Sequence, residues 1–424
     1  MSAGVVKIVH AADIHLDSPL RGLERYEGAP VERIRGATRA ALSRLVDLCI
    51  AERAGLLLLA GDLFDGDWKD YSTGLFFADQ MSRLRAADVR VFIVRGNHDA
   101  ASQVKRHLTL PDNVHEASPL APETLVYDSL GVAVHGQSFE TRAVTDDLAS
   151  GYPDAVPGML NIGVLHTSAT GRAGHEPYAP CTLDVLKSKG YDYWALGHVH
   201  EREVLCEAPW VVFCGNLQGR HARELGDKGA TLIELRDGAI ASVEHRSVDV
   251  VRFVRCEVDL TDVARGDEVP DRVRGEVERA LSAAEGRALV IRVVLRGRTA
   301  AHAVLHAEHV HWVNEIRALA NDVDGNVWIE KVKLETEPLL DQVSGVGRDD
   351  ALGALEGTMR ALRQDEAGLA ELLAGFNELR HKLPPEVRSG EEGLVLEDPA
   401  WLIDALDEVE QLLMQRLLSV EGGE

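Results

Sequence analysis

Short apolar runs alternate with longer amphipathic segments from Val5 to about Val250, and Gly, Asn and Asp separate them. Apolar runs of about 4–8 residues bounded by turn residues are typical of buried strands, whereas a 3/4 spacing over a longer segment is typical of helices. The pattern predicts helices that include Val31–Ala54 and Ser72–Ala86. It predicts strands at Val5–Ala11, Leu56–Ala60, Val89–Val94, Gly131–His135, Asn161–His166, Tyr193–Leu196 and Trp210–Cys214. Such alternation indicates layered α/β architecture.

The pattern divides the chain into three predicted parts: residues 1–250, 251–335 and 336–424. The middle part is predicted to be a compact α+β module. Its expected elements are a strand at Phe253–Val258, a helix at Asp271–Glu285, a strand at Ala288–Leu295, a helix at Val304–Ala320 and a strand at Val327–Leu334. Four histidines of this module have metal-like spacing, namely His302, His306, His309 and His311. Nothing nearby supplies further ligands, so a solvated helix face is the expected role.

Two amphipathic helices are predicted in the last part. Their apolar positions are Leu352, Leu355, Met359, Leu362, Leu369, Leu373 and Phe376 in the first, and Leu402, Leu406, Val409, Leu413, Leu417 and Val420 in the second. Either the helices pack on each other or on the middle module, or they form a hairpin that docks a partner's helices or coiled coil. The pattern leaves both alternatives open.

Composition fits a folded protein of more than one unit, because 424 residues with 45% apolar content exceed what one ordinary core needs. No apolar run reaches transmembrane length, and no basic segment or cleavage site precedes the first strand. We therefore expect a cytoplasmic protein without membrane contact. The five cysteines are scattered and never form a C-x-x-C pair, which favours reduced thiols.

The net charge of −24 argues against tight nucleic-acid binding by this chain alone, since phosphate contacts rely on Lys and Arg. The acidity is unevenly distributed. Residues 335–424 hold 21 Asp+Glu and 7 Lys+Arg, so the tail carries −14 and the first 334 residues carry −10. Bound divalent cations would neutralise several of the remaining carboxylates.

Polar clusters that can bind metal follow five of the predicted strands. They are Asp13-x-His15, Gly61-Asp62-x-x-Asp65, Gly96-Asn97-His98-Asp99, His166 and Gly197-His198-x-His200. Each cluster alone occurs by chance, but all five in this order form a specific signal. Open α/β sheets place ligands at the carboxyl ends of their strands, so we expect the clusters to meet there.

The residue types fit a pair of divalent cations. Two cations about 3.5–4 Å apart need a bridging carboxylate together with imidazole and oxygen ligands. Two Asp, four His and one Asn supply this set, and the glycines before Asp62, Asn97 and His198 let the backbone approach the metals closely. Mixed nitrogen and oxygen ligands without thiolate favour Mn²⁺, with Fe²⁺ and Zn²⁺ as alternatives and an all-oxygen Mg²⁺ site as a poorer fit.

The ordered set D-x-H, G-D-x-x-D, G-N-H-D, H and G-H-x-H resembles the calcineurin-like metallophosphoesterase superfamily over about residues 7 to 200. The resemblance implies a β-sandwich flanked by helices for residues 1–250, followed by a small α+β capping domain and a helical C-terminal hairpin. It also implies that Asp13, His15 and His200 bind one metal and that Asn97, His166 and His198 bind the other, with Asp62 bridging. His98 would protonate or stabilise the leaving oxygen, and Asp65 would orient His98.

Several stretches are similar to bacterial DNA repair exonucleases of the SbcD type, and to their YhaO-like branch in particular. They are Ala12–Asp17, Gly61–Asp65, Gly96–Asp99 and Leu110–Val114. This resemblance implies a metal-dependent DNA exonuclease that acts in DNA repair. In relatives the helical region docks an SMC-like coiled-coil ATPase, which would supply the basic DNA surface that this chain lacks. Related nucleases dimerise, so a homodimer is a further expectation.

Two other classes of function compete with this interpretation. A phosphomonoesterase or small-substrate nucleotide phosphodiesterase uses the same metal pair. Protein phosphatases of the superfamily follow G-D-x-x-D with Arg, whereas this chain has Gly66 and Asp67 there. A non-catalytic adaptor should have lost ligands, yet all seven and His98 are present. Arg220, His221 and Arg223 are further candidates for phosphate contact, and sequence alone assigns them no role.

Overall fold

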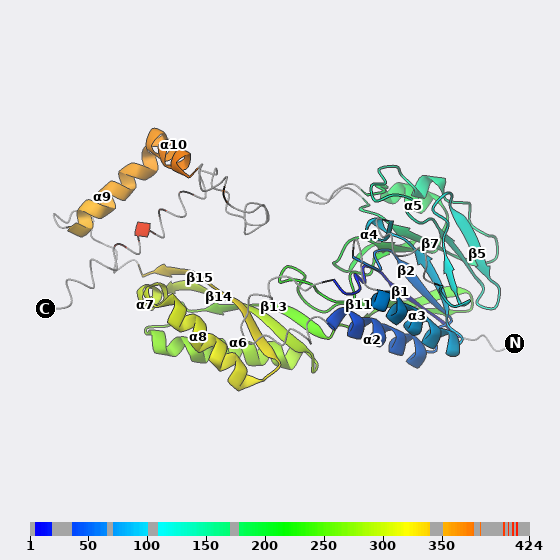
Figure 1. Cartoon of the computed structure of the whole chain (residues 1–424), viewed down its shortest axis with the longest axis horizontal. Coiled ribbons are helices and arrows are strands. Elements are labelled where there is room, and N and C mark those ends of the chain that lie inside the picture. The colour runs from blue at the N-terminus through cyan, green and yellow to red at the C-terminus, as the bar shows by residue number, and fades with distance from the viewer. Residues whose placement is uncertain are drawn as a thin grey trace. The chain divides into compact units, whose positions relative to one another are not determined.

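The computed structural model describes residues 5–18, 36–65, 71–100, 109–169, 178–339 and 351–376, together with Lys382, Leu402, Leu406, Val409, Glu410 and Leu413. The chain divides into two compact units (Figure 1). The first comprises Met1–Arg255, Glu278–Arg292 and Asp324–Lys331, and the second comprises Cys256–Val277, Val293–Val323 and Val332–Glu424.

The first large sheet has six strands in the order β12-β11-β1-β2-β3-β4. Their bounds are β1 Val6–Ala11, β2 Leu56–Ala60, β3 Arg90–Val94, β4 Val114–Glu116, β11 Gly229–Arg236 and β12 Ala239–Ser247. Strands β1 to β4 pair in parallel, while β11 is antiparallel to both β1 and β12. The carboxyl ends of β1, β2 and β3 therefore lie at one edge of this sheet.

The second large sheet also has six strands, in the order β5-β6-β7-β8-β10-β9. Their bounds are β5 Glu123–Tyr127, β6 Val132–Gly136, β7 Leu160–His166, β8 Tyr193–Gly197, β9 Glu203–Glu207 and β10 Trp210–Phe213. Strands β6, β7, β8 and β10 are parallel, and antiparallel β5 and β9 close the two edges.

The two sheets pack face to face, and helices cover their outer faces. The helices are α2 Ala37–Ala51, α3 Tyr71–Ala86, α4 Asn97–Ala100 and α5 Leu183–Ser188. Strand β2 shows why its run is wholly apolar. Leu57 and Leu59 pack in the core beneath α2 and α3, whereas Leu56 and Leu58 pack between the sheets. Successive side chains of a strand point to opposite faces, so a strand covered on both sides needs an uninterrupted apolar run.

This architecture confirms the predicted β-sandwich flanked by helices. Seven predicted strands correspond to β1, β2, β3, β6, β7, β8 and β10, whose bounds differ from the predictions by no more than a residue or so. Five strands were not predicted: β4, β5, β9, β11 and β12. The predicted helix from Val31 begins at Ala37 as α2, and residues 31–35 lie outside the described part of the chain.

A small sheet in the order β13-β14-β15 follows the sandwich. Its strands and accompanying helices are β13 Val251–Asp259, α6 Val269–Ala283, β14 Ala288–Thr299, α7 His302–Ala307, α8 His309–Val323 and β15 Val327–Pro338. The single helix predicted at Val304–Ala320 was wrong, because Glu308 (φ −112°, ψ 33°) separates α7 from α8. The solvated face was wrong for His302, which is buried and whose Nδ1 lies 3.0 Å from Thr336 Oγ1.

The tail contains α9 Ala351–Gln364 and α10 Glu366–Gly375. Apolar residues of both predicted helices pack in one cluster, of which Met359, Leu369, Leu402 and Leu406 are buried. The described part of the tail therefore follows the packing alternative, while docking of a partner stays a prediction. Leu417 and Val420 lie outside the described residues. Within the described segments, no helix has the length and hydropathy to cross a membrane. The boundaries at residues 250 and 335 stay predictions.

Candidate metal centre

The structure brings together all nine residues that the sequence singled out. They follow strand ends: Asp13 and His15 after β1, Asp62 and Asp65 after β2, Asn97 and His98 at the start of α4, His166 at the end of β7, and His198 and His200 after β8. Hydrogen bonds join the two sheets here. His166 Nδ1 lies 2.9 Å from the Ala60 carbonyl oxygen, and the His198 N–H donates to Asp13 Oδ2 at 2.9 Å.

Unusual backbone conformations turn these side chains toward one another. Asp13, His15, Asp62 and His198 all have positive φ, with values of 49°, 43°, 51° and 100°. Non-glycine residues rarely adopt this region, and such strain persists where the surrounding structure enforces it, often at functional sites. Backbone N–H groups of Asp13 and His15 donate to the carbonyl oxygens of Gly61 and Asp62, each at 3.0 Å. The two loops after β1 and β2 thus hold each other in place.

Two of the predicted glycines are required by close approach. A Cβ on Gly96 would lie 2.3 Å from Asp62 Oδ1. A Cβ on Gly197 would lie 1.9 Å from the Ala60 carbonyl oxygen. Both distances are far inside van der Waals contact, so a side chain at either position would displace a candidate ligand or the loop that carries it.

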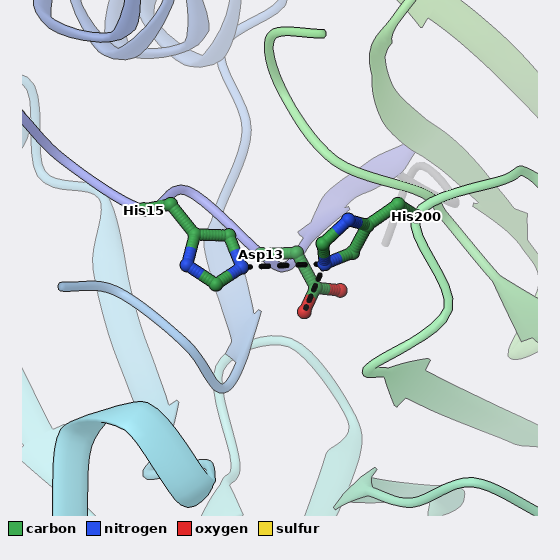
Figure 2. A group of neighbouring side chains, drawn as sticks. All are labelled: Asp13, His15 and His200. Carbon is green, nitrogen blue, oxygen red and sulfur yellow. Dashed lines mark hydrogen bonds and ion pairs between the residues drawn. The ribbon is translucent and has the colours of Figure 1, made fainter. Parts of the chain in front are cut away.

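Asp13, His15 and His200 form the first set of candidate ligands, which we call the Asp13 group (Figure 2). The Nε2 atoms of His15 and His200 face each other at 3.3 Å, and His200 Nε2 lies 3.8 Å from Asp13 Oδ1. Asp13 and His15 are buried, whereas His200 is partly exposed. A neutral imidazole carries its lone pair on one of its two nitrogens, so two facing Nε2 atoms beside a carboxylate suit a shared cation.

Asn97, His166 and His198 form the second set, which we call the His166 group. His166 Nδ1 must donate to the Ala60 carbonyl, because a carbonyl oxygen only accepts. In the neutral ring the lone pair is then on Nε2, which lies 2.9 Å from Asn97 Oδ1. Asp62 Oδ2 lies 3.4 Å from the same nitrogen. Three acceptors that converge in a buried place are stable only around positive charge, so the residues fit a bound cation.

Asp62 lies between the two groups. Its Oδ2 is 3.9 Å from His15 Nε2 in the Asp13 group as well as 3.4 Å from His166 Nε2. Its Oδ1 accepts the backbone N–H of His98 at 3.0 Å. This position agrees with the predicted bridging role, which stays a prediction.

The electrostatics of the site favour cations. Burial raises the pKa of Asp13 to about 6, although positive charge on His200 and His166 opposes the shift. Burial alone would lower the pKa of His166, but the charge of Asp62 and their hydrogen bond outweigh it and raise the pKa to about 9. Burial also opposes ionisation of Asp62, yet the positive charge of His166 outweighs it and holds that pKa well below its usual range. The pocket therefore stabilises positive charge where these side chains meet.

His98 and Asp65 form a pair at the rim. His98 Nδ1 lies 2.8 Å from Asp65 Oδ1, and Ser18 Oγ donates to Asp65 Oδ2 at 2.8 Å. The hydrogen bond to Asp65 raises the pKa of His98 above its usual value. Both side chains are partly exposed, at 30% and 28%. His98 also lies close enough to His15 and Asp62 to be a ligand, so geometry alone permits either role.

Sequence reasoning gave no role to Asp99 or Glu224. Asp99 is buried and accepts the backbone N–H groups of Leu63, Phe64 and Gly96, which ties the G-N-H-D turn to the G-D-x-x-D loop. Its place inside the motif was an available signal. Glu224 contacts His200 from a distant loop, and no motif marks it.

Of the three candidates for phosphate contact, Arg220 lies nearest the site. Its Nη1 is 3.9 Å from Asp65 Oδ2 and its Nη2 is 3.5 Å from Glu224 Oε1. His221 Nε2 lies 3.6 Å from Glu224 Oε1, and Arg223 is exposed. Contact of any of them with phosphate stays a prediction.

Known proteins match this chain in both of its domains. The calcineurin-like phosphoesterase family matches residues 6–202, and the middle domain of metallophosphoesterase YhaO matches residues 253–337. Metallophosphoesterase YhaO of Bacillus subtilis (strain 168) is 35% identical over 293 residues, which are 68% of this chain and 71% of that protein. The chain belongs to the calcineurin-like metallophosphoesterase family. The predicted resemblance to its YhaO-like branch is confirmed.

More distant relatives of this metallophosphoesterase carry nuclease and repair names. The DNA double-strand break repair protein Mre11 of Methanopyrus kandleri is 24% identical over 303 residues, 65% of this chain and 63% of that protein. One component of nuclease SbcCD from Escherichia coli (strain K12) is 21% identical over 287 residues, 58% of this chain and 69% of that protein. The family uses a dinuclear metal site, and the Asp13 and His166 groups with Asp62 are candidate ligands for it.

Proposed function

We propose that this metallophosphoesterase is a Mn²⁺-dependent DNA phosphodiesterase, acting as an exonuclease in DNA repair together with an SMC-like coiled-coil ATPase. One observation carries the proposal. Similarity to the break-repair protein Mre11 extends over 303 residues, farther than the phosphoesterase match over residues 6–202. A site alone does not identify a substrate, because one metal pair serves many phosphate esters. Shared sequence beyond the catalytic core is what favours DNA.

The chain's own residues divide the work of hydrolysis. Two divalent cations, when bound, supply the Lewis acidity that lowers the pKa of water and neutralises charge on the phosphate oxygens. Asp62 holds the two positions together, and His98 delivers a proton to the departing sugar oxygen. Asp65 accepts from His98 Nδ1, so Nε2 is the nitrogen left to act on the substrate. Ser18 fixes Asp65 through its other oxygen.

A partner accounts for the unfavourable charge. With a net charge of −24, of which the tail carries −14, this chain alone is poorly suited to hold DNA. Around the packed apolar cluster of the tail, Leu372, Val409 and Leu413 are 40%, 47% and 38% exposed. We propose that these side chains dock the coiled coil of the ATPase, which supplies the basic DNA surface. A homodimer belongs to the same proposal, and light scattering of the full chain tests it.

Hydrolysis of three substrates tests the activity. Wild type and His98→Ala are compared on bis-p-nitrophenyl phosphate, p-nitrophenyl phosphate and end-labelled linear DNA, with Mn²⁺ or EDTA, with and without a purified SMC-like ATPase. Metal-dependent degradation of DNA that the mutation removes supports the proposal. Monoester hydrolysis with DNA left intact in every mixture would replace it with a phosphomonoesterase. No hydrolysis of any substrate would favour a non-catalytic adaptor.

Binding of the ATPase is tested separately. Val409→Glu places a charge among the exposed apolar side chains of the tail and should weaken association at least tenfold in a titration with the purified ATPase. Leu120→Glu is the matched control, because Leu120 is 78% exposed in the catalytic domain. Equal affinities for both variants would exclude this docking surface.

A further inference from the structure

Glu224 lies behind His200, on the loop between β10 and β11, and is only 7% exposed. Its Oε1 lies 2.7 Å from His200 Nδ1. Its Oε2 accepts from Asn216 Nδ2 at 2.9 Å and from the backbone N–H of Arg220 at 2.6 Å. Both carboxylate oxygens are thus engaged, and the carboxylate is held in one orientation.

These contacts determine which nitrogen of His200 carries the proton. An ionised carboxylate has no hydrogen to donate, so His200 Nδ1 must be the donor in this pair. The lone pair of the neutral ring is therefore on Nε2. That atom is the one that faces His15 Nε2 at 3.3 Å and Asp13 Oδ1 at 3.8 Å (Figure 2). Glu224 thus selects the tautomer that can bind a cation in the Asp13 group.

The His166 group contains an independent counterpart. There the Ala60 carbonyl oxygen accepts from His166 Nδ1 and leaves Nε2 free for a cation. Each metal position has one histidine oriented by its own acceptor, a carboxylate for His200 and a backbone carbonyl for His166. Outer partners of this kind fix the ring orientation of a metal-binding histidine and raise its basicity.

We propose that Glu224 is a positioning residue that holds His200 in its metal-binding tautomer, and so controls cation binding in the Asp13 group while leaving the His166 group unaffected. The inference rests on the metal centre described above and is independent of whether DNA is the substrate. Arg220 supports the arrangement, since its Nη2 lies 3.5 Å from Glu224 Oε1 and balances the buried negative charge.

Glu224→Gln should reverse the tautomer. Asn216 Nδ2 and the Arg220 N–H both donate to Oε2, so the carbonyl oxygen of a glutamine will occupy that position. Its NH₂ group then faces His200 Nδ1, which has to accept, and the proton of the neutral ring moves to Nε2. An isosteric substitution thus blocks the metal-binding nitrogen without creating a cavity.

The test measures Mn²⁺ binding to the metal-stripped full chain by calorimetry and electron paramagnetic resonance, using wild type, Glu224→Gln and Glu224→Ala. We expect one of two Mn²⁺ ions to bind about 10–100-fold more weakly in both variants, the loss typical of such outer partners, with the other affinity unchanged. The spin-coupled pair signal should give way to that of an isolated ion at limiting Mn²⁺. In the apo protein, ¹⁵N shifts should place the His200 proton on Nδ1 in wild type and on Nε2 in Glu224→Gln.

Glu123→Gln is the matched control. Glu123 makes a similar carboxylate–imidazole contact, with Oε1 2.6 Å from His115 Nε2, outside the candidate ligand groups. It should bind both ions as wild type does. Two wild-type affinities in either Glu224 variant would overturn the proposal, and so would equal weakening of both positions, which indicates general loss of structure. If Glu224→Ala does not fold, Glu224→Gln decides the outcome alone, because it preserves the volume of the side chain.

Discussion

Replacing His98 by Ala distinguishes a proton donor from a metal ligand. Asp65 holds the His98 ring at 2.8 Å and raises its pKa, as a general acid requires near neutral pH. Loss of a general acid typically costs about 10²–10⁴-fold in rate, which corresponds to about 3–5 kcal/mol in the barrier. We expect this loss where the leaving group is a sugar oxygen, which departs poorly without a proton. Metal binding should persist, because Asp62 accepts from the His98 backbone N–H and not from its side chain.

The assay compares kcat for a dinucleotide and for bis-p-nitrophenyl phosphate, each with saturating Mn²⁺. The p-nitrophenolate group leaves without protonation, so His98→Ala should lower its release far less than it lowers dinucleotide cleavage. His115→Ala is the control, since His115 also pairs with a carboxylate but lies outside the ligand groups. Equal losses on both substrates together with loss of one Mn²⁺ would make His98 a ligand. Unchanged cleavage of the dinucleotide would remove it from the chemistry.

Three further predictions concern charge, bridging and packing. Asp65→Asn removes the hydrogen bond that raises the pKa of His98, so protonated His98 is lost at lower pH and the alkaline limb of the kcat/KM profile should move to lower pH. Asp62→Asn should weaken both Mn²⁺ ions in calorimetry, and selective loss of one would contradict a bridging role. Gly163→Ala places a Cβ 2.4 Å from the Trp194 ring and should lower the free energy of unfolding by about 1–3 kcal/mol in urea titration, with Mn²⁺ affinity unchanged.

The central strands were predictable because the physics behind them is local. Strand β2 is buried along its whole length, so its sequence is an uninterrupted apolar run. The missed strands lack that signal. Strand β4 has only partly buried residues, and β12 is half-exposed throughout. Strand β11 is buried but contains Thr231, which packs inside the sandwich and interrupts the apolar pattern.

The ligand positions were predictable because strand ends converge, while the residues that support them were not. Motif order placed Asp13, Asp62 and His166 at the ends of separate strands, and the fold brings those ends to one edge. Glu224 is 24 residues from the histidine that it orients, and the path of its loop determines their contact. Contacts of this kind depend on tertiary structure, so no local pattern predicts them.

Anomalous diffraction from crystals soaked in Mn²⁺ tests the dinuclear centre most directly. We predict two peaks about 3.5–4 Å apart on either side of Asp62, one in the Asp13 group and one in the His166 group. A single peak, or two peaks away from Asp62, would contradict the account.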